Sequence, residues 1–263
     1  MNGFRDLVAA EWIKFWSLRS TPWACGLAVL FFIGAAINSA TDRLHYVNPA
    51  DRWWATHYDP LWDAFPSVGV SVLVLITGSL GALMLAGEYG TGLMRTTLAA
   101  VPARRSVIAA KAAVLAPVML GVGLAAGGLA FWSSQAILSS KHSGISIGHP
   151  GALRALLGFA LYVPVSALIG LGIAALIRHT AGSVLATVGV LLLLPLLIDS
   201  SVHRWTADLH NALPGTALSR LSTLNGYEYG HYPPTLTGSW VVYAAWSFAA
   251  ILAAVIVVKR RDP

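Results

Sequence analysis

Charged side chains are scarce in this sequence: Asp, Glu, Lys and Arg make up only 11% of its 263 residues, against about 25% in an ordinary soluble domain. Hydrophobic residues make up 56%, and the mean hydropathy is +0.68. This balance excludes a soluble globular protein. It also excludes a disordered chain, because disorder requires low hydrophobicity and high net charge. The single cysteine, Cys25, has no partner within the chain and excludes a disulfide scaffold.

Motifs for binding nucleotides and metals are also missing. The sequence contains no GxxxxGK[ST] loop and no GxGxxG after a strand, so we expect the chain not to bind ATP by itself. The HExxH and paired CxxC patterns of zinc sites do not occur either. We therefore expect a chain that is not an enzyme, with no catalytic residue, no metal site and no cofactor of its own.

Long apolar runs dominate what is present. Six runs of at least 20 residues contain no Asp, Glu, Lys or Arg, and a helix needs about 20 apolar residues to cross a bilayer. The continuously apolar stretch 191–198 does not alternate as the strands of a membrane barrel do. We predict an all-α integral membrane protein with one transmembrane domain over residues 1–263. Its six spans are expected at about 22–40, 66–87, 107–138, 154–177, 181–198 and 238–258.

The basic residues are distributed unevenly between the two sides of these spans. The side that carries both termini holds eleven of the 17 Lys and Arg residues, and the alternate side holds six. Cytoplasmic segments carry the excess of Lys and Arg in membrane proteins. We therefore expect a multi-pass protein of the plasma (cytoplasmic) membrane with both termini inside. The net charge of +6 is then explained by this topology and does not indicate nucleic-acid binding.

The N-terminal segment 2–20 differs from the spans because charged and aromatic residues are interleaved in it at helical spacing. This pattern is typical of an amphipathic helix that lies in the plane of the lipid headgroups. We predict an interfacial elbow helix before the first span, in contact with membrane lipid. Its expected interfacial anchors are Trp12, Phe15 and Trp16.

The link between spans two and three, 88–106, is the longest segment on the side of the termini. Gly90 and Gly92 allow the backbone to turn, and Pro102 stops or redirects a helix. Between these breaks, Leu98 and nearby apolar residues are expected to form a short face beside Arg95. The pattern predicts a short helix that presents apolar and basic groups, which is typical of a docking surface.

The same segment carries a resemblance to a known family. The run is Glu88-Tyr89-x-Thr91-Gly92-x-x-Arg95-Thr96-Thr97-Leu98-x-x-x-Pro102-x-x-Arg105, followed by Lys111. It is similar to the cytoplasmic signature of type-2 ABC transporter permeases, the membrane subunits of exporter-type ATP-binding cassette systems. Elbow helix, span number and predicted orientation resemble that family over the whole chain, whereas the motif itself covers 86–111. Gly90 departs from the pattern, since relatives often carry a polar or basic residue there.

The resemblance implies a membrane subunit that couples to a separate ATPase. The residues that would form or brace the coupling element are Glu88, Gly92, Arg95, Leu98, Pro102, Arg104, Arg105 and Lys111. ATP and Mg would be bound by an ABC ATPase subunit in another chain. Because six spans normally make half of a transport pathway in this family, a second copy of the permease or a sibling chain is also implied.

Two other classes of function remain open from the sequence. The first is a membrane scaffold or sensor that binds an ATPase without moving a solute, and the second is an intramembrane lipid-modifying enzyme. The enzyme predicts activity without an ATPase, and nucleotide-dependent movement of a substrate separates the permease from the scaffold. No residue of the spans is assigned to substrate binding.

Overall fold

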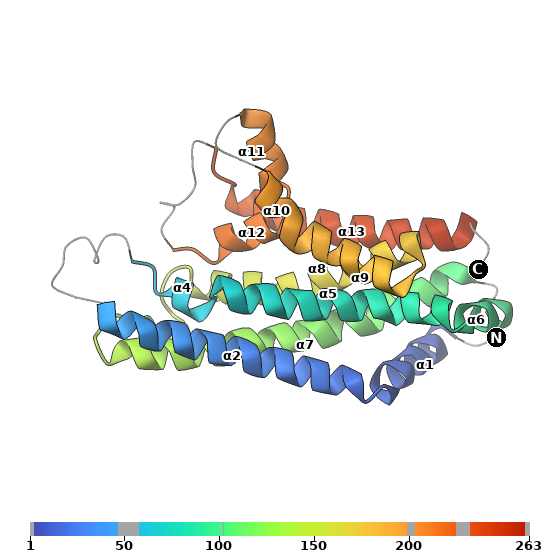
Figure 1. Cartoon of the computed structure of the whole chain (residues 1–263), viewed down its shortest axis with the longest axis horizontal. Helices are drawn as coiled ribbons and strands as arrows, with labels where there is room; N and C mark the ends of the chain where they lie inside the picture. The colour runs from blue at the N-terminus through green and yellow to red at the C-terminus, as the bar shows by residue number, and fades with distance from the viewer. Residues whose placement is uncertain (1–2, 47–57, 102, 199–202, 225–231, 261–263) are drawn as a thin grey trace.

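In a computed structural model, residues 3–46, 58–101, 103–198, 203–224 and 232–260 are described, and every regular element among them is a helix. Six of these helices are long and apolar enough to cross a membrane, which confirms the prediction of an all-α membrane protein. They form one elongated bundle with both termini at the same end, here called the termini end (Figure 1).

The predicted spans correspond to the six long helices, several of which continue beyond the apolar runs. Polar residues extend α2 to Tyr46 and allow α7 to begin at Arg104, because helical hydrogen bonding does not stop where the hydrocarbon layer ends. The spans are α2 (Ser20–Tyr46), α5 (Ser67–Gly90), α7 (Arg104–Ser139), α8 (Ala152–Ile177), the α9–η1–α10 unit (Thr180–Val188, Gly189–Leu193 and Leu194–Leu197) and α13 (Leu236–Arg260).

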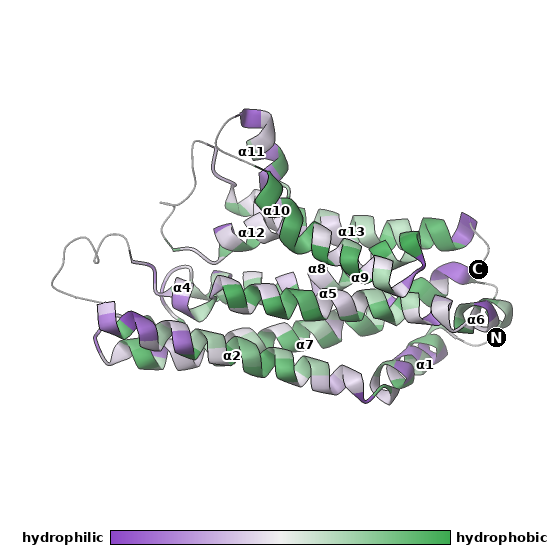
Figure 2. Cartoon of the chain, viewed as in Figure 1, coloured by the Kyte–Doolittle hydropathy of each residue, from purple (hydrophilic) through white to green (hydrophobic). Residues whose placement is uncertain are grey.

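Shorter helices lie at the two ends of the bundle (Figure 1). At the termini end are α1 (Phe4–Ser17) and α6 (Leu93–Ala100), and at the opposite end are α4 (Leu61–Ala64), α11 (Arg204–Asn211) and α12 (Pro214–Leu221). Hydropathy follows the same division, with apolar residues along the spans and hydrophilic residues gathered toward the ends (Figure 2). Exposed apolar side chains on the span surfaces, such as Leu185, Leu197 and Phe248, suit contact with lipid.

Helix α8 forms the centre of the bundle and packs against α5, α7 and α13. Glycine makes the closest contacts possible: a Cβ atom at Gly81 of α5 would lie 1.9 Å from the carbonyl oxygen of Ala167 in α8. A Cβ atom at Gly170 of α8 would lie 2.0 Å from the carbonyl oxygen of Gly78. Small residues at such crossings let membrane helices approach through their backbones. The two ends of the bundle are therefore joined by a tightly packed α5–α8 pair.

Candidate functional site

The 88–106 segment lies at the termini end and contains one short helix, α6, between the ends of α5 and α7. The turn before α6 is made by Gly92, whose φ of +73° is a left-handed conformation that favours glycine. The predicted short helix is thus present, with the first of its two expected breaks at Gly92. Pro102, the second expected break, lies outside the described residues.

The two faces of α6 differ in exposure. Met94 and Leu98 are buried against the bundle, whereas Leu93 and Arg95 are exposed. This corrects the expectation that Leu98 presents an apolar group outward, because an eight-residue helix uses its apolar stripe to attach itself to the protein. The surface that α6 offers to another molecule therefore contains Leu93 and Arg95, and Leu98 holds the helix in place.

A closed ring of four charged side chains lies beside this segment. Lys14 Nζ of α1 donates to Glu11 Oε1 and to Glu88 Oε1, at 3.0 Å in each case. Lys111 Nζ of α7 lies 2.8 Å from Glu11 Oε2 and 2.8 Å from Glu88 Oε1. The ring ties the elbow helix α1 to the last turn of α5 and to α7, so three elements are held together by alternating charges.

Three members of the ring are withdrawn from solvent, since Glu11, Glu88 and Lys111 are all buried. Burial on its own lowers the pKa of the Lys14 ammonium, but the hydrogen bonds and charges of Glu11 and Glu88 outweigh it and raise that pKa above its ordinary value. Buried charges are tolerated when each meets an opposite charge. Glu88 and Lys111, two residues singled out by the motif, therefore brace the segment and do not present their charges outward.

Two further contacts connect the 88–106 segment to the later spans. The guanidinium carbon of Arg178, in the turn between α8 and α9, lies 5.0 Å from the ring centre of Tyr89, a favourable cation–π geometry. Arg104 Nη1 donates to the carbonyl oxygen of Val258 in α13 at 3.4 Å. Arg105, the next residue, is exposed. The segment thus contacts parts of the chain that are distant in sequence on both of its flanks.

The predicted anchors of the elbow helix divide into two kinds. Trp12 and Trp16 are 48% and 40% exposed, so both rings reach the surface of the protein. Phe15 is buried and belongs to the hydrophobic core, which corrects its assignment as an interfacial anchor. The reason is helical geometry: Phe15 lies one turn from Glu11, on the face of α1 that packs against α7.

The structure also bears on two other kinds of chemistry. Gly144, Ser146 and Gly148 have the G-x-S-x-G spacing of a serine nucleophile, but they lie in the irregular connection between α7 and α8, whereas the hydrolase motif requires a strand-to-helix turn. The described residues include no group of three His, Cys, Asp or Glu side chains that is suited to a metal ion.

Sequence comparison adds no assignment, because no family model and no curated protein matches the chain.

Sequence reasoning located the segment but missed most of its supports. Glu11 and Lys14 are separated from their partners by up to 100 residues, and Arg178 is also distant from Tyr89 in the chain. A charged residue inside or next to an apolar span is a signal for such pairing, because it needs a partner in the bundle. Lys111 gave that signal, but the sequence alone does not identify the partner.

Proposed function

We propose that this chain is the membrane-spanning permease subunit of an ATP-driven ABC exporter. The observation that carries the proposal is α6: a short helix at the termini end exposes Leu93 and Arg95 while the ring of four charges and two distant contacts hold its flanks. Because its flanks are held in this way, a displacement of α6 by a bound partner also displaces α1, α5, α7 and the later spans. The motif in 88–106 supports the same function.

In this proposal the partner at α6 is an ABC ATPase subunit that binds ATP and Mg. The excess of Lys and Arg at the termini end supports a cytoplasmic position for both termini in the plasma membrane. The pathway is completed by a second copy of this chain or by a sibling permease. Arg95 contacts the ATPase directly, whereas Glu88, Lys111 and Leu98 act by positioning α6.

The orientation is tested by labelling introduced cysteines with a membrane-impermeant maleimide. Cys25 is the single cysteine and is buried, so Arg95→Cys and Arg204→Cys each add one reactive thiol at an exposed position. In intact cells we expect labelling of the Arg204→Cys chain, and labelling of the Arg95→Cys chain only after permeabilisation. The reverse pattern would place the termini outside and remove the proposed access to ATP.

The function is tested by purifying the chain from its native membrane in mild detergent and searching for a co-purifying protein with a Walker A loop. We expect one ATPase subunit per permease. We also expect the rate of ATP hydrolysis by this subunit to change when the permease is bound. Arg95→Glu reverses the exposed charge of α6 and is expected to abolish this response, and Arg260→Glu reverses an exposed charge outside α6 and serves as the control. ATPase binding without nucleotide-dependent substrate movement would favour the scaffold, and lipid chemistry without an ATPase would favour the enzyme.

A further inference from the structure

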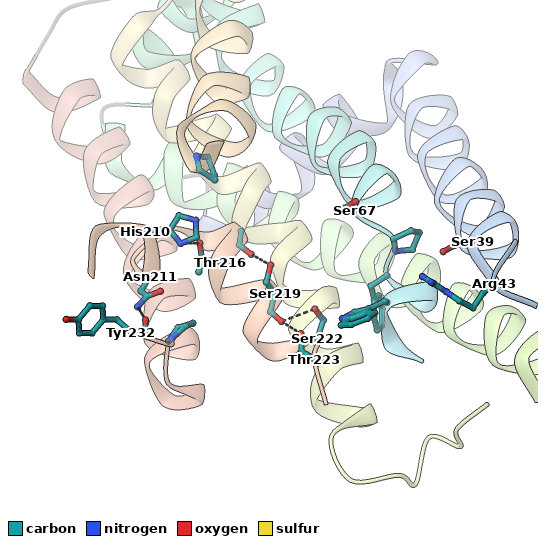
Figure 3. A pocket seen from close by; sticks show the side chains of 16 residues that line it. Ser39, Arg43, Ser67, His210, Asn211, Thr216, Ser219, Ser222, Thr223 and Tyr232 are labelled. Carbon is teal, nitrogen blue, oxygen red and sulfur yellow. Dashed lines mark hydrogen bonds between the residues drawn. The ribbon is translucent and has the colours of Figure 1, made fainter. Parts of the chain in front are cut away.

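The end of the bundle opposite the termini contains an open cavity of about 680 Å³, within the range of about 300–1,000 Å³ that is usual for small-molecule sites. Its walls come from α2 and the start of α5 on one side and from α11 and α12 on the other (Figure 3). Several lining residues carry hydroxyl groups. They are Ser39, Ser67, Thr216, Ser219, Ser222, Thr223 and Tyr232.

The α11–α12 wall is held rigidly by hydrogen bonds to three other parts of the chain. Arg154 of α8 donates through Nη2 to the carbonyl oxygen of Thr223 at 2.7 Å. Trp246 of α13 donates through Nε1 to the carbonyl oxygen of Ala212 at 2.8 Å. The backbone N–H of Leu224 donates to the buried carboxylate of Asp59 at 2.5 Å. These hydrogen bonds tie the wall to α8, to α13 and to the residues just before α4.

The hydroxyls of this wall face a ligand mainly as acceptors. Ser219 Oγ donates its one hydrogen to the carbonyl oxygen of Gly215 at 3.2 Å, and Ser222 Oγ donates to that of Ser219 at 3.3 Å. Ser39 Oγ across the cavity donates to Asp63 Oδ1 at 2.6 Å. A hydroxyl oxygen retains lone pairs after it has donated its hydrogen. These hydroxyl oxygens can therefore accept hydrogen bonds from a ligand that supplies donors.

The described part of the lining also contains donors and one charged side chain, Arg43. Arg43 lies at the wall, and its Nε is 3.3 Å from Asp63 Oδ2, so a fully buried carboxylate offsets its charge. Asn211 Nδ2 donates one hydrogen to the carbonyl oxygen of Tyr232 at 3.0 Å and keeps a second. Among the residues that the structure describes, no Asp or Glu lines the cavity. A cationic ligand would meet no carboxylate among the described lining residues, and an anionic ligand would compete with Asp63 for Arg43.

Aromatic rings complete the site, since Trp62, Phe65 and Tyr232 also line it. An aromatic face packs against the C–H face of a sugar ring, while the hydroxyls of the sugar both donate and accept hydrogen bonds. We propose that this cavity binds an uncharged polyhydroxylated group, of which a sugar ring is the type. The group is either a free saccharide or the glycosyl headgroup of a lipid, and the inference does not depend on coupling to an ATPase.

The test measures binding to the full chain purified in a detergent without a sugar headgroup, because a glycoside detergent would occupy the site. Glucose and maltose are the free probes, followed by saturation-transfer NMR. Monoglucosyl diacylglycerol in phosphatidylcholine nanodiscs is the lipid-borne probe, followed by native mass spectrometry. Choline and inorganic phosphate serve as charged probes. We expect saturable binding of at least one glycosyl probe and no saturable binding of the charged ones.

The variant Ser219→Ala removes an acceptor from the wall and is expected to weaken glycosyl binding about tenfold, since the ligand donor loses its partner. Ser71→Ala is the matched control, because Ser71 Oγ also donates to the carbonyl oxygen four residues earlier, at 2.8 Å, but Ser71 does not line the cavity. Equal effects of the two variants would overturn the proposal. Failure of every glycosyl probe to bind, or preferential binding of choline or phosphate, would overturn it as well.

Discussion

At the termini end, two glutamates and two lysines form a closed ring of ion pairs, whereas at the opposite end uncharged hydroxyls surround an open cavity. The ring members line a smaller cavity of about 380 Å³, and their charges are paired with one another because a buried charge needs an opposite partner. Along the α11–α12 wall, Ser219 and Ser222 already donate to carbonyl oxygens of the same segment, so their oxygens are left as acceptors at the cavity. The comparison shows that charge pairing connects α1, α5 and α7 at one end, whereas neutral polar groups line the larger cavity at the other.

The largest loss of stability is expected from breaking the ring at its most buried member, Lys111. Lys111→Met leaves Glu11 and Glu88 with only Lys14 between them, and removing one partner of a buried ion pair costs about 3–5 kcal/mol. Lys259→Met removes an exposed lysine at the same end and is expected to change stability by less than about 0.5 kcal/mol. Unfolding in detergent measures both, and equal stabilities would show that the ring does not hold the termini end together.

A smaller effect is expected in the middle of the bundle, where α5 and α8 join the two ends. In Gly81→Ala the new methyl group meets the backbone of Ala167, and overpacking of this kind costs about 1–3 kcal/mol. Gly87→Ala is the control on the same helix, because a Cβ atom there has no neighbour within 4 Å. Thermal unfolding compares the two variants. A loss of stability in Gly87→Ala as large as in Gly81→Ala would contradict the close crossing.

The contact between Tyr89 and Arg178 is expected to contribute less again, about 0.5–1 kcal/mol for a partly exposed cation–π pair. A double-mutant cycle with Tyr89→Leu and Arg178→Leu isolates this coupling from the other effects of each change. The same variants are expected to reduce the response of a bound ATPase without reducing its binding. A coupling energy of zero would show that the Tyr89–Arg178 contact does not connect the 88–106 segment to the turn after α8.

The smallest expected effects are changes in stability with pH, and these changes have opposite signs at the two ends of the bundle. The pKa of Lys14 is raised above 10.5, so its contribution to stability is complete below that pH and is lost as the pH rises through the raised value. Burial lowers the pKa of His210 beneath 6.5, so its contribution is complete above that pH and is lost as the pH falls through the lowered value.

Stability profiles of matched variants check these signs. The difference between wild type and Lys14→Met should shrink as the pH rises above about 10.5, and the difference between wild type and His210→Gln should shrink as the pH falls below about 6.5. A Lys14→Met difference that stays constant through the alkaline range would show that the ring does not favour the protonated lysine.

The sequence predicted the spans because a run of about 20 apolar residues has few alternatives to a membrane helix. It also located α6 between its flanking breaks, although it placed Leu98 on the wrong face, since the periodicity of a short helix defines a stripe but not its direction. The ring and the cavity were not predictable in this way. Ser39 and Ser219 come from elements far apart in the chain, and only the fold brings them to one cavity.

The central claim, that α6 contacts an ATPase, is tested most directly by photo-crosslinking in the native membrane. A benzophenone maleimide on Arg95→Cys samples the exposed face of α6, and the same reagent on Arg204→Cys samples another exposed site at the opposite end. The account predicts an adduct between position 95 and a protein that contains a Walker A loop, with no such adduct from position 204. Absence of an ATPase adduct from position 95, in membranes where the labelled chain is folded, would contradict it.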